Sequence, residues 1–210
     1  PLRYVFFRAI RGCNYSALQL YLWLMSASKK IILGIDPGTI VLGYGIIEVE
    51  KQKITLLSMG VIHLSKYEDH LHKLKIIYEK IEVLIENYQP VACAIEAPFF
   101  GKNVQSMLKL GRAQGVAIAS ALTNDVEVFE YSPKKIKQSI TGNGNASKEQ
   151  VAAMLQQLCK FKLQPKFLDA TDGLAAAVCH HFQTGNSRVL SASKVSGWKD
   201  FISKNPKRVK

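Results

Sequence analysis

Cysteine pairs and long apolar runs are both missing from this sequence, and each absence excludes a class of protein. The four cysteines lie far apart and form no C-x-x-C pair. Three of them sit in apolar stretches, where cysteine usually acts as a small buried hydrophobe, so a reduced, cytosolic compartment fits better than a disulfide scaffold. The longest apolar runs, such as residues 113–122, fall short of the roughly 20 residues that a membrane span needs. A membrane protein is therefore not expected.

The overall composition is that of a folded protein with a core. Of the 210 residues, 48% are hydrophobic, which is enough to bury a core and excludes wholesale disorder. This length fits one domain, or at most two small ones.

Positive charge is concentrated at the two ends of the chain. The net charge is +12; residues 1–24 contain three arginines and no acid, and residues 186–210 contain seven basic residues and one acid. Such charge attracts a polyanion, either nucleic acid or anionic lipid, over long range. Lysine-rich tails that only aid solubility are the alternative.

The two ends also differ from the middle in pattern. Residues 1–24 show no clean period, and Met25 opens a polar stretch before a strand-like run. We expect 1–24 to be a non-core extension with Met25 as the natural start, or alternatively an arginine-rich targeting peptide. Residues 25–185 are expected to form one domain, and the Ser/Lys/Asn-rich residues 186–210 a flexible basic tail.

Hydrophobic periodicity predicts an α/β domain. The first three strands are expected to form an antiparallel meander, and later strands alternate with helices, which is typical of a mixed sheet covered by helices. Ser147 and Gln150 have the spacing of a helix capping box. The expected strands are residues 31–36, 41–49, 54–64, 91–95 and 126–131, and the expected helices are residues 71–85, 103–123, 147–159 and 168–183.

Four acidic residues stand at the ends of these elements. Asp36 ends the first strand, Glu96 follows the strand at 91–95, and Asp169 and Asp172 lie three residues apart on one face at the start of the last helix. The carboxyl ends of strands border the crevice where α/β proteins place ligands. Four carboxylates gathered there need a counter-charge, and oxygen-only ligands select Mg²⁺ or Mn²⁺ over zinc.

Each acid also has a structural alternative. Asp36 begins an Asp-Pro-Gly sequence, which is a common turn, and Glu96 is equally consistent with an exposed strand end. Asp169 fits a helix N-cap, with Asp172 favouring the helix dipole at the N3 position, three residues later. A cap role and a ligand role are compatible.

Five ordered sequence blocks resemble one protein family. They cover about residues 30–183 and follow the family order and spacing of the RuvC Holliday-junction resolvases. The blocks are IILGIDPGTIVLGYGIIE, AIEAPFFGKN, LKLGRAQGVA, VFEYSPKKIKQSITGNGNASKEQV and LDATDGLAAAVCH.

This resemblance implies an RNase H-like fold with a mixed five-stranded sheet, three antiparallel strands followed by parallel strands, flanked by helices. It implies a homodimer that cuts four-way DNA junctions with divalent metal, Mg²⁺ or Mn²⁺, with two ions per active site holding the scissile phosphate between them. The family's acidic positions fall on Asp36, Glu96, Asp169 and Asp172. Asp36 is the expected ligand shared by both ions. The cut would leave 5′-phosphate and 3′-hydroxyl ends.

DNA contacts are expected near a stretch without acids, residues 131–148. Its lysines supply salt-sensitive affinity for phosphates, and the glycine loop at 142–145 lets backbone N–H groups approach them; a solvated helix followed by a flexible turn is the alternative. The resemblance places Lys137 and Lys148 at basic positions near DNA. It places Phe99 where an aromatic ring stacks on opened bases, and Lys102 begins the next helix, whose N-terminus could hold a phosphate.

Partners and rival functions follow from the same blocks. Gly111 and Gly115 make the helix at 103–123 a candidate dimer interface, with packing inside the monomer as the alternative. The RuvA–RuvB branch-migration motor is implied by the resemblance alone. Two rivals are a catalytically inactive junction-binding protein and an actin-like ATPase, for which the core of the chain leaves too little room.

Overall fold

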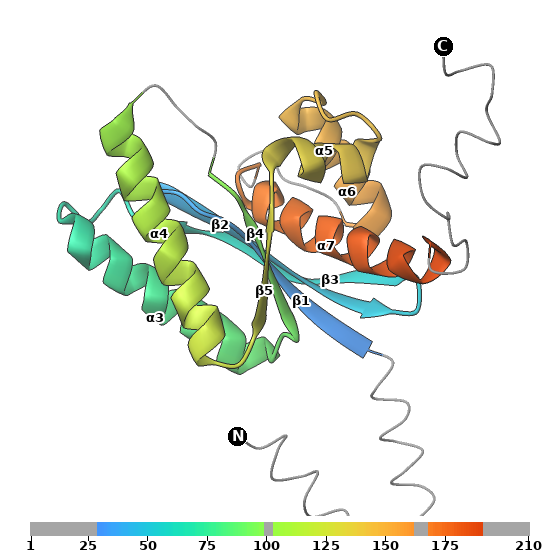
Figure 1. The fold of residues 1–210 in the computed structure, drawn as a ribbon, viewed down its shortest axis with the longest axis horizontal. Helices are drawn as coiled ribbons and strands as arrows, with labels where there is room; N and C mark the ends of the chain where they lie inside the picture. Colours follow the sequence, from blue (N-terminus) through green and yellow to red (C-terminus); the bar gives the residue numbers. More distant parts are fainter. Residues whose placement is uncertain (1–28, 99–102, 162–167, 191–210) are drawn as a thin grey trace, which may run out of the picture.

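A five-stranded sheet forms the centre of the protein (Figure 1). The structure, a computed structural model, describes residues 29–98, 103–161 and 168–190, with side chains up to residue 185. The strand order is β3-β2-β1-β4-β5. The strands are β1 (Lys29–Asp36), β2 (Val41–Glu50), β3 (Lys53–His63), β4 (Ala92–Glu96) and β5 (Glu127–Tyr131).

The pairing of the strands confirms the predicted mixed sheet. β1 pairs antiparallel with β2, and β2 pairs antiparallel with β3. β4 runs parallel to β1 on one side and to β5 on the other. β1 lies at the centre, and residues 32–35 are all buried, because a strand covered on both faces is apolar throughout. The meander and the later parallel strands are therefore as expected.

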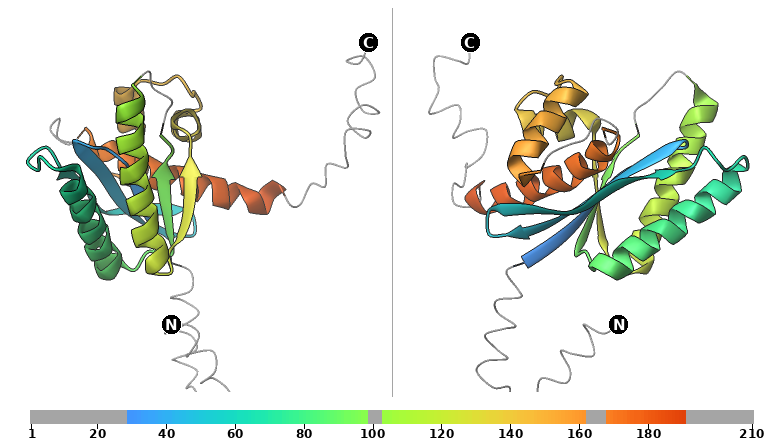
Figure 2. Two further views of the ribbon diagram at one scale, coloured as in Figure 1. Left: turned by 60° about the vertical axis from the view of Figure 1, so that its left-hand side comes forward. Right: turned by 180° about the vertical axis from the view of Figure 1, so that it is seen from behind.

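Helices cover both faces of this sheet (Figures 1 and 2). One face carries α3 (His70–Tyr88) and α4 (Val104–Thr123). The other face carries α5 (Pro133–Thr141), α6 (Lys148–Cys159) and α7 (Ala170–Leu190). None of the helices in the described ranges has the combination of length and apolarity that crossing a membrane requires.

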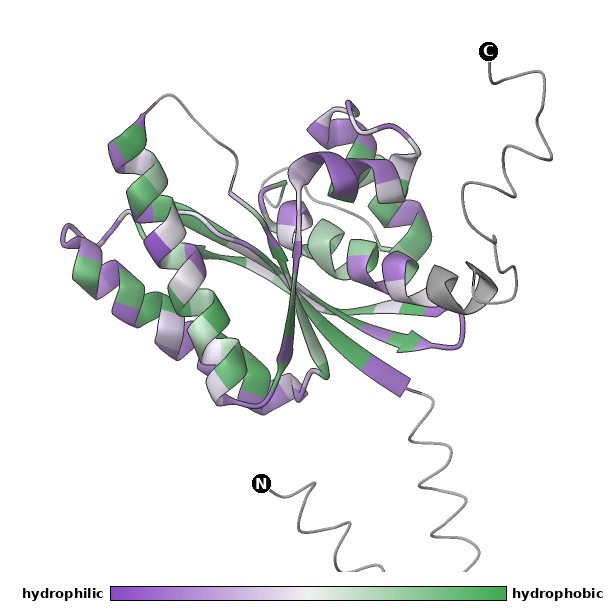
Figure 3. Ribbon diagram, viewed as in Figure 1, coloured by the Kyte–Doolittle hydropathy of each residue, from purple (hydrophilic) through white to green (hydrophobic). Residues whose placement is uncertain are grey.

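Two hydrophobic cores result from this arrangement, one on each side of the sheet. Ile77 and Ile81 of α3 pack in the core that contains Leu33, whereas Leu174 of α7 packs in the core that contains Ile32. Ile32 and Leu33 are neighbours in β1, and successive side chains of a strand point to opposite faces. Apolar residues accordingly recur along the helices beside the sheet (Figure 3).

The first turns of α7 lie directly on the backbone of the sheet. A Cβ added at Gly34 of β1 would come within 2.1 Å of the carbonyl oxygen of Gly173, and one added at Gly45 of β2 would come within 2.4 Å of Leu174 Cα. Only glycine permits such an approach. This contact brings the start of α7 beside the end of β1.

Two helices differ from the sequence-based expectations. α5 was expected only as the alternative interpretation of residues 131–148, yet it has clear end signals: the Ser132 side chain caps it, Pro133 opens it and Gly142 ends it with a φ of 75°. α7 continues to Leu190, past the expected end at residue 183 and into the expected tail. Gly185 lies inside this helix, where a glycine is tolerated at a cost of about 1 kcal/mol relative to alanine.

Candidate active site

Two of the predicted acids stand side by side at the ends of adjacent parallel strands. Asp36 is the last residue of β1 and Glu96 the last residue of β4. The register pairs Ile35 with Ile95, so the next residue of each strand is one of these acids. Both side chains are partly buried, and neither has a hydrogen-bond or ion-pair partner in the described part of the chain. We call Asp36 and Glu96 the open pair.

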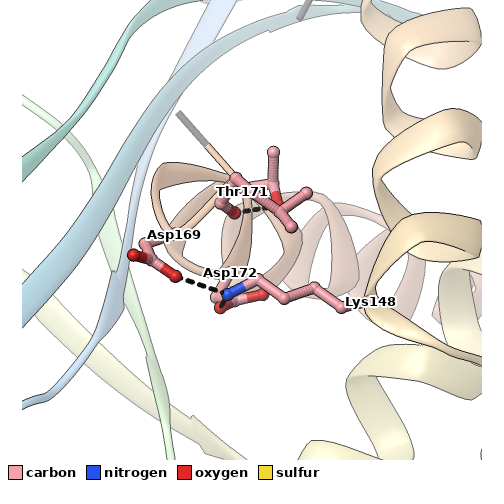
Figure 4. Close-up of polar contacts among 5 residues, drawn as sticks. Lys148, Asp169, Thr171 and Asp172 are labelled. Carbon is pink, nitrogen blue, oxygen red and sulfur yellow. Dashed lines mark hydrogen bonds and ion pairs between the residues drawn. The ribbon is translucent and has the colours of Figure 1, made fainter. Parts of the chain in front are cut away.

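The other two acids lie at the start of α7 and share one lysine (Figure 4). Lys148 Nζ lies 2.8 Å from Asp169 Oδ1 and 2.6 Å from Asp172 Oδ2. The Asp172 side chain is 28% exposed and that of Asp169 is 66% exposed. We call Asp169 and Asp172 the closed pair, because an ammonium group already bridges their carboxylates.

Burial and neighbouring negative charges raise the pKa of both members of the open pair. The pKa of Asp36 is raised to about 7, first by burial and then by the negative charges of Asp172 and Asp169, with Lys148 opposing. The pKa of Glu96 is raised to about 8 by burial and by the charges of Asp36 and Asp172. Like charges held close together disfavour ionisation of both. The open and closed pairs therefore belong to one electrostatic site.

The closed pair is better compensated. Burial raises the pKa of Asp172 above its usual range, and the hydrogen bond and charge of Lys148 oppose this rise. For Lys148, burial lowers the pKa, but the hydrogen bonds and charges of Asp169 and Asp172 outweigh burial and raise it overall. Lys148 is thus a firmly charged ammonium group.

The donor chemistry of this site fits a hard divalent cation. All four side chains offer carboxylate oxygens, which Mg²⁺ and Mn²⁺ prefer, and the open pair is partly buried with no direct ion-pair partner among the described residues. No three His, Cys, Asp or Glu side chains in the described ranges are already grouped closely enough to hold an ion. The acids are coupled but not preassembled, and the ammonium of Lys148 is the cation that the closed pair holds instead.

Lys137 reaches the same site from α5. The Glu96–Tyr131 register pair and the bond from Ala97 N–H to Tyr131 O (2.8 Å) fix the end of β5 beside Glu96, and α5 begins two residues later. The charge of Lys137 accordingly opposes the rise in the pKa of Glu96 and of Asp172. The sequence-based expectations included this helix only as an alternative, although its cap, proline and glycine are helix-end signals.

The remaining predicted DNA contacts are Phe99, Lys102 and the glycine loop at residues 142–145. Phe99 and Lys102 lie outside the described residues. In the glycine loop, the N–H of Asn143 donates to Thr141 Oγ1, that of Asn145 donates to Asn143 Oδ1, and that of Gly142 donates to Gln138 O. These three amides are therefore already hydrogen-bonded within the protein, and the approach of the loop's N–H groups to a phosphate stays a prediction.

A cavity of ≈ 450 Å³ lies elsewhere, between α5 and α7, and contains none of the four acids. Its lining residues are Lys135, Gln138, Ser139, Phe182 and Gln183. His180, farther along α7 than Asp172, is buried and hydrogen-bonded to the Tyr131 hydroxyl at 2.8 Å. It therefore belongs to the core.

The fold, with acids at the ends of adjacent parallel strands and at the start of the packed helix, defines the class of an RNase H-like nuclease domain. A family model of the crossover junction endodeoxyribonuclease RuvC matches residues 32–180. The chain belongs to the RuvC family.

Individual relatives agree with this membership. A crossover junction endodeoxyribonuclease RuvC from Cytophaga hutchinsonii is 62% identical over 181 residues, covering 86% of this chain and 88% of the relative. One from Christiangramia forsetii is 57% identical over 183 residues, covering 87% and 94%. The structure of T. thermophilus RuvC in complex with Holliday junction substrate is similar with a TM-score of 0.70 and 31% identity, covering 75% of this chain and 96% of that one.

Proposed function

We propose that this protein is a metal-dependent endonuclease that resolves Holliday junctions in homologous recombination and DNA repair. The observation that carries the proposal is the coupling of Asp36, Glu96 and Asp172 at one edge of the sheet, in a chain of the RuvC family. The similarity to a RuvC bound to a Holliday junction substrate supports the choice of substrate.

The four acids would hold Mg²⁺, with Mn²⁺ as a substitute, and two ions per site. When bound, two such ions activate the attacking water and neutralise charge on the scissile phosphate and the leaving 3′ oxygen. Asp36 lies on a rigid central strand. Its negative charge interacts with those of Glu96 and of the closed pair, which favours Asp36 as the ligand shared by both ions. Asp169 and Asp172 complete the site from α7.

Hydrolysis by this site needs no protein nucleophile. The acids would hold the cations and are not consumed; water adds to phosphorus as the bond to the 3′ oxygen breaks, so the products would carry 5′-phosphate and 3′-hydroxyl ends that a ligase seals. Lys137 and Lys148 contribute positive charge beside the acids, where a DNA phosphate must approach. Phe99 and Lys102 remain predicted contacts to the opened bases and the backbone.

A junction has approximate two-fold symmetry, so two strands need two identical sites, and we infer a C₂ homodimer. The exposed apolar residues of α4 support this helix as the interface; they include Val104, Leu108 and Leu122. We also infer a cytoplasmic location, because the substrate is DNA, and a functional partnership with RuvA–RuvB, which rests on the family resemblance alone.

Cleavage of a mobile four-way junction tests the proposal. The full chain is incubated with Mg²⁺ and either the junction or a linear duplex of matched sequence, with EDTA as the metal-free control. We expect paired nicks in opposed strands of the junction, sealed by ligase, and an intact duplex. Tight junction binding without cutting, in Mg²⁺ and in Mn²⁺, would instead establish the inactive junction-binding protein.

A further inference from the structure

Lys148 projects toward the acids from a fixed backbone position. It is the first residue of α6, directly after the N-cap residue Ser147. The N–H of Gln150 donates to Ser147 Oγ at 3.3 Å, and the N–H of Ser147 donates to Gln150 Oε1 at 2.9 Å. This reciprocal cap, expected from the sequence, fixes the start of the helix. The reach of the lysine side chain is therefore defined.

Its ammonium group makes two short contacts, to Asp169 Oδ1 and to Asp172 Oδ2 (Figure 4). The Lys148 side chain is 33% exposed and that of Asp172 is 28% exposed. Water therefore screens the ion pair between Lys148 and Asp172 less than it screens an open surface pair. Lys137 also lies near the acids, but it forms no ion pair within the ranges that the structure describes. Of these two lysines, Lys148 is therefore the one that bridges the two carboxylates of the closed pair.

We propose that Lys148 is an internal counter-ion of the closed pair, and that a divalent metal displaces it on binding. The proposal rests on the proposed function, because it requires a metal at these acids. A magnesium ion binds carboxylate oxygens at about 2.1 Å, and a second positive centre a few ångströms away repels it. The ammonium contact and full metal loading are therefore alternatives at the same oxygens.

This exchange gives Lys148 two successive partners. Without metal, the ammonium group keeps two neighbouring carboxylates from repelling each other and so holds them in place. After metal loading, the displaced ammonium group is free to pair with a DNA phosphate beside the site. Linkage then requires that metal raise the affinity for DNA and that DNA raise the affinity for metal to the same degree. Lys148 acts as a positioning residue that couples the two.

Acetylation of lysines, measured by mass spectrometry on the full chain without DNA, tests the exchange independently of cleavage. We expect Lys148 to react slowly in EDTA and at least about threefold faster in saturating Mg²⁺, because its ion pair is released. Lys80, exposed on α3, is the internal control and should not change. Calorimetry on the same sample measures Mg²⁺ and Mn²⁺ binding.

The outcomes separate this inference from the proposed function. Metal binding with unchanged Lys148 reactivity would overturn the counter-ion role and leave the nuclease proposal standing. If neither Mg²⁺ nor Mn²⁺ bound, both would be overturned.

Two matched variants give a second readout. Lys148→Met removes the competing ammonium group, so we expect Mn²⁺ to bind roughly tenfold more tightly by calorimetry. Lys137→Met removes a nearby charge that bridges no acids, and the gain should stay below about threefold. Equal gains in the two variants would show a general charge effect and contradict a specific exchange.

Discussion

Asp36 and Glu96 are ionisable groups whose behaviour depends on where their strands end. Both follow a buried strand residue, so both are partly withdrawn from water; the charge of Asp36 adds to the pKa rise of Glu96, and the charge of Asp172 adds to the pKa rise of both. A raised carboxyl pKa without a salt-bridge partner is typical of a site built for an external cation. The open pair is therefore destabilised without metal and suited to binding it.

This arrangement predicts a pH-dependent stability of the metal-free protein. The pKa of Asp36 rises from 3.8 to about 7 on folding, so the folded state binds more protons than the unfolded state between these values, and its stability falls as the pH rises. At 1.36 kcal/mol per pKa unit the upper limit is ~4 kcal/mol. Urea denaturation in EDTA at pH 4.5 and 8 should show a fall in unfolding free energy.

The Asp36→Asn variant isolates this contribution. Because asparagine does not titrate, we expect it to reduce the pH-dependent fall by about 1–3 kcal/mol, whereas Glu127→Gln, at the opposite end of the sheet, should retain the fall. A fall of equal size in Asp36→Asn and the parent chain would contradict the assigned cause.

At the residue scale, the positions of the acids were predictable and their pairing was not. Asp36 and Glu96 stand at strand ends, and parallel strands end at the same edge of a sheet. Lys148 was expected near DNA, but its contact with Asp169 and Asp172 depends on how α6 docks beside α7. Hydrophobic periodicity along one segment carries no information on that distance.

At the scale of elements, α7 is what joins the two acid pairs. Its contact with β1 and β2 depends on glycines in both strands and in the helix. None of these glycines was predicted to mediate a close approach, because an isolated glycine in a strand or helix does not reveal which segment approaches it. α5 is a different case, since its proline and glycine signals were present and were not used.

Gly173→Ala should disturb both stability and cleavage. The added Cβ would come within 2.6 Å of Tyr44 Cα and 2.7 Å of Gly43 O, so α7 must move away from the sheet, at a cost of about 1–3 kcal/mol. Asp172, the neighbouring residue, moves with it, and a shift of about 1 Å reduces the rate up to ~100-fold. Thermal denaturation and single-turnover cleavage measure the two effects.

Gly185→Ala is the matched control on the same helix. A Cβ at Gly185 meets nothing within 4 Å in the described part of the chain, so this variant should cut at the parent rate and be as stable as the parent or up to about 1 kcal/mol more stable. Equal behaviour of the two alanine variants would contradict the role given to the close approach.

At the scale of the whole molecule, the helix layers on the two faces of the sheet differ in what they contribute. α5, α6 and α7 lie on one face of the sheet, whereas α3 and α4 form a layer on the opposite face (Figure 2). Among the described residues, nothing lies within 4 Å of a Cβ added at Gly111 or Gly115 of α4, so no close approach within the described part of the monomer requires these glycines. Val104, Leu108 and Leu122 are 68%, 53% and 56% exposed on the same helix.

The exposed apolar residues of α4 predict that the protein forms a dimer through this helix. Leu108→Glu would place a charge in the interface, which costs several kcal/mol if it remains unpaired, so we expect a monomer by sedimentation velocity. Val83→Glu on α3, where the valine is 48% exposed, should leave the dimer intact. A Leu108→Glu variant that sediments as the parent does would exclude α4 as the interface.

The central claim is that the four acids form one metal-dependent nuclease site, and single-turnover cleavage of a four-way junction in Mg²⁺ tests it most directly. The chains compared are the parent, Asp36→Asn, Glu96→Gln and the control Glu127→Gln, with junction binding measured on the same samples. We predict that Asp36→Asn and Glu96→Gln bind the junction but cut it at least ~100-fold more slowly, a loss of about 2.7 kcal/mol of transition-state stabilisation, while Glu127→Gln cuts at the parent rate. Cleavage by both open-pair variants at the parent rate would contradict the claim.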